Sequence, residues 1–328
     1  MNSKIQTALE SIYISPLEGC NLACKYCYTH KTSDVLSNQQ ILNFINQYSD
    51  FIHESYFLNL KSILFCGGEV FLLPDFPKLV NTLIDQNIFV TIITNGTIDR
   101  LQEIKKPDSC QILVSLDGPK EIHDQNRGLG NFDKSIKYIE HAQELGFPVG
   151  IMFLVTKDSY QYKDSFPYFL SRELEHQDTS KLSVTYLTDR KMSLTHDQCL
   201  DIKLHYPTFP NKNFGCYQLS LQSNGNITGC CESSISLGTI TDNPQIYVSK
   251  LINSLSKCIS CPIHESCIMN PESYSCRGCS DPAYFCGYPQ EFHQKSCQDI
   301  IKMFNTKPTL PSSERGGLKI NKNKNLKS

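Results

Sequence analysis

Short apolar runs alternate with segments of helical period from residue 11 to about residue 187. Six of these runs are typical of buried strands: 11–15, 62–65, 88–94, 112–116, 149–155 and 182–187. A strand followed repeatedly by a helical segment predicts a parallel sheet wound with helices. Periodicity does not decide whether such a sheet closes into a partial barrel or stays open.

Local signals mark the helices of two connections. Ser37 and Gln40 form a capping box before an apolar helical face made of Ile41, Leu42, Phe44, Ile45, Tyr48 and Ile52. Between the fourth and fifth strands, we expect Asn131 to cap a helix and Gly146 to end it. The apolar residues of that second helix are Phe132, Ile136, Ile139 and Leu145.

The pattern changes after about residue 190, where Gly, Ser, Asn and Pro become frequent. Eleven of the sixteen cysteines lie between Cys199 and Cys297. We therefore expect three parts: an α/β domain over 1–190, a small and irregular Cys-rich domain over 191–306, and a disordered basic tail over 307–328.

The overall composition narrows the function. With 40% hydrophobic residues, 20% charged residues and a formal net charge of −2, the chain is typical of a globular protein, and its charge disfavours nucleic acid and membrane surfaces as partners. No apolar run is long enough for a signal peptide or a membrane span, so we expect a cytoplasmic protein. Disulfides are rare in that reducing compartment, where close cysteine clusters are typical of metal or cluster ligands.

Three cysteines, Cys20, Cys24 and Cys27, follow the first predicted strand. Their loop leaves the carboxyl end of the strand, which is the edge where α/β folds build their sites. Three thiolates can hold three irons of a [4Fe–4S] cluster and leave the fourth iron for another ligand. Two alternatives stay open, namely half of a zinc site completed by His30 and a thioredoxin-like pair of Cys24 and Cys27.

Later strand ends carry residues suited to a ligand: Gly67, Gly68, Glu69, Asn95, Ser115 and Arg127. The glycines allow a close approach of the backbone, and Glu69 can accept hydrogen bonds from an ammonium group. Asn95 and Ser115 can bond a ribose or a carboxylate, and Arg127 can pair with a carboxylate. Singly these are ordinary loop residues, but at successive strand ends after a three-thiol loop they favour a cofactor pocket.

The CxxxCxxC loop, with Tyr26 before its last cysteine, resembles the signature of the radical S-adenosylmethionine (SAM) enzymes. Cys66-Gly67-Gly68-Glu69 is similar to the family's GGE motif, and the order of the peptide-modifying members continues in Thr94-Asn95-Gly96, Ser115-Leu116-Asp117-Gly118-Pro119, His123, Asp124 and Arg127-Gly128. One departure is Val70, where many members carry proline, and we expect it to change loop stiffness more than ligand binding. The resemblance implies a (β/α)6 partial TIM barrel.

The same resemblance implies the chemistry. A [4Fe–4S] cluster would be held by Cys20, Cys24 and Cys27, and the SAM site would be formed by Tyr26, Gly67, Gly68, Glu69, Asn95, Ser115 and Arg127. Within that site, Glu69 would hold the methionine ammonium and Arg127 its carboxylate. An electron from a flavodoxin or ferredoxin-type reductant would cleave SAM to a 5′-deoxyadenosyl radical, which removes a hydrogen atom from a peptide or protein side chain.

The second cysteine set resembles the SPASM extension of radical SAM maturases, which carries auxiliary [4Fe–4S] clusters. The matching positions are Cys216, Gly225, Cys230, Leu237-Gly238-Thr239-Ile240, Cys258, Cys261, Cys267, Cys279 and Cys297. The resemblance implies two auxiliary clusters, one held by Cys258, Cys261, Cys267 and Cys297 and the other by Cys216, Cys230 and Cys279. The spacer 268–278 is longer than is usual in the family, so Cys276 is an alternative to Cys279.

Other interpretations of these cysteines stay open. The fourth ligand of the second set is Cys231, Cys276, a more distant thiol or a substrate. Two structural zinc sites would use similar CxxC pairs. We expect Cys66, Cys110 and Cys199 to be core thiols. The role of Cys286 is open between a hydrogen-atom donor to a substrate radical and a buried thiol without a catalytic role.

Three functions compete at this point. The main hypothesis is a peptide or protein maturase, and the alternatives are a twitch-like radical SAM enzyme acting on a small molecule or cofactor precursor and a non-catalytic iron–sulfur electron carrier. The GGE segment opposes the carrier, which needs no SAM pocket. Only about nineteen residues precede Cys20, which leaves no room for the leader-binding domain of many maturases. The sequence therefore predicts a separate peptide-recognition protein or direct binding at the barrel mouth.

Overall fold

The structure is a computed structural model, and the residues that it describes are 1–27, 29–174, 183–188, 198, 201, 216–231 and 236–259. Its core is one nine-stranded sheet in the order β6-β5-β4-β3-β2-β1-β7-β8-β9. Six parallel strands follow chain order: β1 Ser11–Ile14, β2 Ser62–Phe65, β3 Phe89–Thr94, β4 Cys110–Leu116, β5 Val149–Val155 and β6 Ser183–Thr188. All six lie where the apolar runs predict them.

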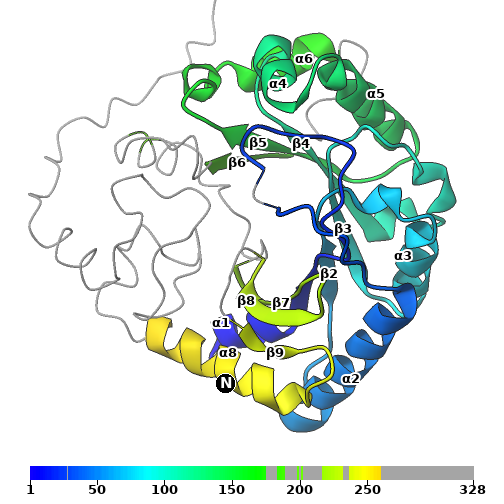
Figure 1. Ribbon diagram of the computed structural model, residues 1–328, viewed down its shortest axis with the longest axis vertical. Coiled ribbons are helices and arrows are strands. Elements are labelled where there is room, and N and C mark those ends of the chain that lie inside the picture. Colours follow the sequence, from blue (N-terminus) through cyan, green and yellow to red (C-terminus); the bar gives the residue numbers. More distant parts are fainter. Residues whose placement is uncertain are drawn as a thin grey trace, which may run out of the picture.

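Helices connect these strands, and α2, α3 and α5 lie on the outer side of the curved sheet (Figure 1). The α-helices of this part are α1 Ser3–Leu9, α2 Asn38–Tyr56, α3 Phe76–Asp85, α4 Lys120–Arg127, α5 Asn131–Glu144 and α6 Phe166–Glu173. Short 3-10 turns are η1 Val70–Leu72, η2 Leu101–Glu103, η3 Pro107–Ser109 and η4 Tyr160–Tyr162. The predicted (β/α)6 partial barrel is confirmed.

The predicted start of α2 is confirmed in its hydrogen bonds. Gln40 N donates to the Ser37 hydroxyl, and Ser37 N donates to Oε1 of Gln40 at 2.9 Å. The buried face of the helix consists of Ile41, Phe44, Ile45, Tyr48 and Ile52. These residues recur at helical spacing, so α2 covers the sheet with one apolar stripe.

The predicted cap of α5 is wrong. Gly130, with a left-handed φ of 78°, precedes the helix, and Asn131 is its first residue. The Asn131 side chain donates to the Arg127 carbonyl instead, at 2.8 Å. The carboxylate of Asp124 accepts from the backbone N–H groups of Gly130 and Phe132, both at 2.8 Å. Because the α4–α5 turn is so short, the preceding helix supplies the cap.

The sheet continues beyond the partial barrel. The added elements are β7 Cys216–Leu221, β8 Asn226–Cys230, β9 Ser236–Thr239 and α8 Pro244–Ile259. β7 pairs parallel with β1, and β8 and β9 follow antiparallel. Leu219, Ile227 and Tyr247 belong to the same apolar core as the barrel residues. This stretch was expected to be poor in regular structure, but its described part shares the sheet and core of the barrel.

Several expectations fall outside the described residues. They concern the basic tail 307–328 and the cysteines Cys199, Cys261, Cys267, Cys276, Cys279, Cys286 and Cys297. Within the described part, no helix is both long enough and apolar enough to span a membrane.

Candidate cofactor site

The three-cysteine loop connects β1 to α2 and crosses the carboxyl edge of the sheet towards β4 (Figure 1). A bridge between Leu17 and Val35 closes the base of the loop. Cys20, Cys24 and Cys27 are half-buried cysteines on it. The loop thus has the position predicted from the sequence, at the edge where parallel strands present their ends.

Two of the three sulfurs already have polar neighbours. Leu22 N donates to Cys20 Sγ at 3.3 Å, and Cys27 Sγ lies 3.1 Å from the Thr29 hydroxyl. Burial raises the pKa of the Cys20 and Cys24 thiols. Both are therefore protonated at neutral pH in the metal-free protein, and a bound metal centre has to displace those protons.

The spacing of the thiols bears on what they can hold. Among the described residues, no three His, Cys, Asp or Glu side chains converge on a point where a single metal ion would bind. A zinc ion needs four ligand atoms within about 2.3 Å of one centre, whereas each thiolate of an iron–sulfur cluster binds an iron of its own. Three thiols on one loop match the three protein ligands of a [4Fe–4S] cluster whose fourth iron is left for another ligand, so this donor set fits such a cluster.

Gly67 and Gly68 pack against the cysteine loop itself. Gly68 N donates to the Leu17 carbonyl and Glu69 N to the Gly19 carbonyl, at 3.0 and 2.9 Å. A Cβ on Gly68 would lie 1.9 Å from the Gly19 oxygen, and one on Gly67 would lie 2.3 Å from the Leu17 oxygen. The close approach that requires glycine is thus to the loop backbone.

Glu69 is almost completely buried, with 1% of its surface exposed. Its carboxylate accepts hydrogen bonds from the Thr94 hydroxyl and from Asn95 N, all at 2.9 Å. Burial raises the pKa of this carboxyl from 4.5 to about 7, although the hydrogen bonds from Asn95, Thr94 and Phe71 lower it. A buried carboxyl poised near neutrality favours a cationic partner.

The side chain of Asn95 makes hydrogen bonds to the start of the cysteine loop and to Thr97. Its Nδ2 donates to Asn21 Oδ1 at 3.0 Å, and its Oδ1 accepts from the backbone and hydroxyl of Thr97. Asn21 in turn donates to the Thr97 hydroxyl at 2.8 Å. The predicted ribose or carboxylate contact therefore competes with bonds that fasten the start of the loop.

Arg127 lies at the other end of the loop. Its Nε donates to Asp117 Oδ1 at 2.8 Å, and the Tyr26 hydroxyl donates to Asp117 Oδ2. The Arg127 guanidinium carbon lies 5.6 Å from the centre of the Tyr26 ring. Asp117 is fully buried and Arg127 is 9% exposed. The loop and α4 are therefore joined through one carboxylate.

Two predicted ligand residues retain free donors. Within the part of the chain that the structure describes, neither Ser115 Oγ nor the Nη atoms of Arg127 make a hydrogen bond. Two further donors, His123 Nε2 and Asn126 Nδ2 of α4, are buried without a hydrogen-bond partner. Neither side chain was among the ligand residues predicted from the sequence. Burial lowers the pKa of His123 from 6.5 to about 4, so its imidazole is neutral. Buried donors without partners are uncommon in folded proteins and favour a ligand nearby.

The second cysteine set is only partly described. Cys216 of β7 and Cys230 of β8 are direct partners in the strand register, and Cys258 lies in the last turn of α8. Cys231 follows β8, and its carbonyl accepts from Gln222 Nε2 at 3.3 Å. Cys110 is buried in the core, as predicted, whereas Cys66 is half-buried beside the glycine pair.

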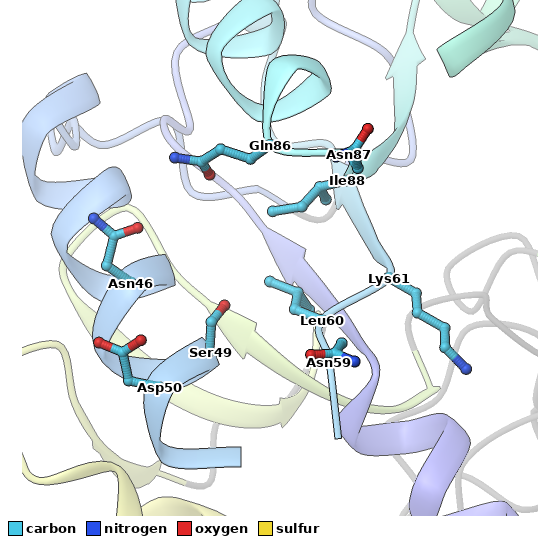
Figure 2. Close-up of a pocket in the computed structure, with 9 residues that line it drawn as sticks. All are labelled: Asn46, Ser49, Asp50, Asn59, Leu60, Lys61, Gln86, Asn87 and Ile88. Carbon is cyan, nitrogen blue, oxygen red and sulfur yellow. The ribbon is translucent and has the colours of Figure 1, made fainter. Parts of the chain in front are cut away.

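A pocket of about 640 Å³ lies elsewhere, at the amino ends of β2 and β3 (Figure 2). It is lined by Asn46, Ser49, Asp50, Asn59, Leu60, Lys61, Gln86, Asn87 and Ile88. The residues that precede the two strands form one wall, and α2 forms the other. This is the edge opposite the cysteine loop, so the pocket is not part of the candidate site.

Residues 14–165 match the radical SAM superfamily, and this stretch includes the cysteine loop and the ends of the first five strands. The chain carries a radical SAM domain. Such a domain implies a [4Fe–4S] cluster and SAM.

Known proteins resemble part of the chain. An Fe-coproporphyrin III synthase from Methanosarcina barkeri is 32% identical over 148 residues, which cover 43% of this chain and 35% of that protein. A cysteine-type anaerobic sulfatase-maturating enzyme from Clostridium perfringens is 30% identical over 187 residues, half of each chain. The chain thus spans about a third to a half of the length of these relatives.

The fold likeness extends further along the chain. The structure of native anSMEcpe with bound AdoMet and Cp18Cys peptide has a TM-score of 0.60, covers 90% of this chain and 95% of its own, and is 20% identical. At this identity the likeness concerns the fold alone.

Proposed function

We propose that this chain is an enzyme that uses a [4Fe–4S] cluster and SAM to remove a hydrogen atom from a peptide or protein side chain. The observation that carries the proposal is the three-thiol loop, which lies at the carboxyl edge of six parallel strands beside a buried carboxyl and unpartnered donors. An electron carrier would not need those donors. When bound, the cluster and SAM supply a 5′-deoxyadenosyl radical.

In this proposal, Cys20, Cys24 and Cys27 are the protein ligands of the cluster. Glu69 accepts hydrogen bonds from the methionine ammonium, because its buried carboxyl needs a cation to ionise fully. Ser115 and the free Nη atoms of Arg127 donate to the methionine carboxylate. The work of the chain is to hold the reacting groups in register and to exclude water.

The substrate class rests on the relatives. The anSMEcpe structure names a bound peptide, and the Clostridium protein is named a sulfatase-maturating enzyme, which supports a peptide or protein substrate. The Methanosarcina protein is named for a porphyrin product, which supports a small-molecule substrate as the second candidate. We favour the peptide because the sequence likeness to the sulfatase-maturating enzyme covers half of each chain, whereas that to the synthase covers 43% of this chain and 35% of that protein.

Two auxiliary [4Fe–4S] clusters form part of the proposal. The register pairing of Cys216 and Cys230 supports a shared site at the end of the β7–β8 hairpin. Cys258, Cys261, Cys267 and Cys297 would hold the second cluster, with Cys279 completing the hairpin set. The remaining partner in this proposal is a flavodoxin or ferredoxin-type reductant in the cytoplasm.

The test is SAM cleavage by the anaerobically reconstituted, reduced protein, followed as 5′-deoxyadenosine. Replacing Cys20, Cys24 and Cys27 together by Ala should abolish the product and leave the C-terminal irons bound. Product at the parental rate in the triple variant would overturn the radical reaction. A cysteine-containing peptide should stimulate cleavage more than an iron porphyrin, and the reverse result would favour the small-molecule candidate.

A further inference from the structure

Asp117 joins three segments of the chain through buried hydrogen bonds. Its two carboxylate oxygens have different partners, because Oδ1 accepts from Arg127 Nε at 2.8 Å and Oδ2 accepts from the Tyr26 hydroxyl. Tyr26 belongs to the cysteine loop, Asp117 to the end of β4 and Arg127 to the end of α4. Their exposed fractions are 7%, 0% and 9%.

The group formed by Tyr26, Asp117 and Arg127 lies where it holds the cysteine loop in place. Tyr26 lies directly before Cys27, and the Arg127 guanidinium covers the Tyr26 ring. A second link is the hydrogen bond from Lys25 N to the Asn126 carbonyl, at 3.1 Å. The stretch between Cys24 and Cys27 is therefore tied to α4 through both side chains and backbone.

Burial makes Asp117 hard to replace. A buried carboxylate is tolerated when it is paired and hydrogen-bonded, and removing its partner is strongly destabilising. Asp117 also holds Arg127 through Nε alone, which leaves the two Nη groups of the guanidinium fork for another acceptor. One residue thus fixes the loop and orients an arginine.

We propose that Asp117 is the positioning residue of the cofactor site, which holds the loop through Tyr26 and presents Arg127 to the methionine carboxylate. The inference rests on the proposed function, since it assigns a role beside the proposed cluster and SAM. In this proposal Asp117 acts through Tyr26 and Arg127, to which its two carboxylate oxygens are bonded. Its carboxylate charge also offsets the Arg127 guanidinium next to Cys24, and the loss of that charge should make the cluster easier to reduce.

Three variants separate these roles. Tyr26→Phe removes only the hydroxyl bond, so iron release from the loop cluster to a chelator should accelerate severalfold. Asp117→Asn should accelerate iron release as well, raise the Kd for SAM about tenfold and raise the midpoint potential of the cluster. The double variant should release iron no faster than Asp117→Asn alone, because Tyr26 acts through Asp117.

Asp124→Asn is the matched control. Asp124 is an acidic residue of α4, the helix that carries Arg127, and its carboxylate caps α5 instead of bonding to Tyr26. It should leave the midpoint potential and the Kd for SAM unchanged.

The outcomes are decisive for the proposal. An unchanged potential and Kd in Asp117→Asn would overturn it, as would additive effects of the two substitutions on iron release. If Asp117→Asn does not fold, parental iron release in Tyr26→Phe still overturns the link to the loop. Failure of the proposed function is separate, because the parent would then bind no more iron than the protein without the three loop cysteines.

Discussion

Gln218 of β7 donates a hydrogen bond from Nε2 to the Ser11 hydroxyl oxygen of β1, at 2.8 Å and across 207 positions of the chain. Ser62 of β2 donates to the same oxygen at 2.9 Å. The Gln218 side chain is buried. Ser11 is thus the polar link between the barrel and the added hairpin.

Ser11→Ala should destabilise the protein by about 1–3 kcal/mol, because it removes the hydroxyl that accepts the hydrogen bond of the buried Gln218 amide. Ser11→Ala combined with Gln218→Leu should recover most of the loss, since both polar groups are then removed. Urea unfolding of the metal-free protein, followed by circular dichroism, measures the difference. Equal stability of Ser11→Ala and the parent would contradict this account of the link.

Gly68→Ala should cost more than about 4 kcal/mol, because the added Cβ would meet the Gly19 carbonyl at 1.9 Å. Gly19→Ala, on the facing loop, is the control, since its Cβ would find only Leu17 Cδ1 at 3.8 Å. The iron content of the loop site and the unfolding temperature report both effects. The proposed packing of the glycine pair on the loop would be disproved by equal iron retention in the two variants.

Affinity for SAM should depend on pH through Glu69. Its raised pKa, about 7, means that the carboxyl loses its proton as the pH rises through neutrality and only then carries the charge that attracts an ammonium group. The Kd should therefore rise severalfold from pH 8 to pH 6. Glu69→Gln should bind more weakly at pH 8 and lose this dependence below neutrality. A parental pH profile in Glu69→Gln would move the ammonium contact elsewhere.

The anaerobically reconstituted chain should carry about twelve irons, four for each of three [4Fe–4S] clusters. Without Cys20, Cys24 and Cys27 it should retain about eight. Cys258→Ala should lower the count further and loosen the C-terminal part, whereas Cys110→Ala, in the barrel core, should not change it. About four irons together with stoichiometric zinc would replace the auxiliary clusters by structural zinc sites.

The strands were predictable because each is a short apolar run whose partner is the next strand along the chain. Val149–Val155, for example, is buried at every position, so no alternation was needed to find it. The capping box of α2 was equally local, since Ser37 and Gln40 lie three positions apart. Likewise, Cys20, Cys24 and Cys27 lie close together in sequence, so their shared loop was visible in their spacing, and the family resemblance implied a cluster there.

Contacts between distant segments were not predictable. The Tyr26–Asp117 bond spans 91 positions, and nothing in either local sequence indicates it. The pairing of β7 with β1 was missed for the same reason. The α5 cap failed differently, because Asn131 is a good capping residue but the Asp124 carboxylate already holds the neighbouring N–H groups.

The position of β1 inside the sheet has a consequence for synthesis of the chain. β1 carries the cysteine loop and lies between β2 and β7, so one of its edges stays unpaired until residue 221 has left the ribosome. Such an edge invites pairing with other chains. A truncated chain ending after β6 should therefore aggregate, and the loop should acquire its final surroundings only late in translation.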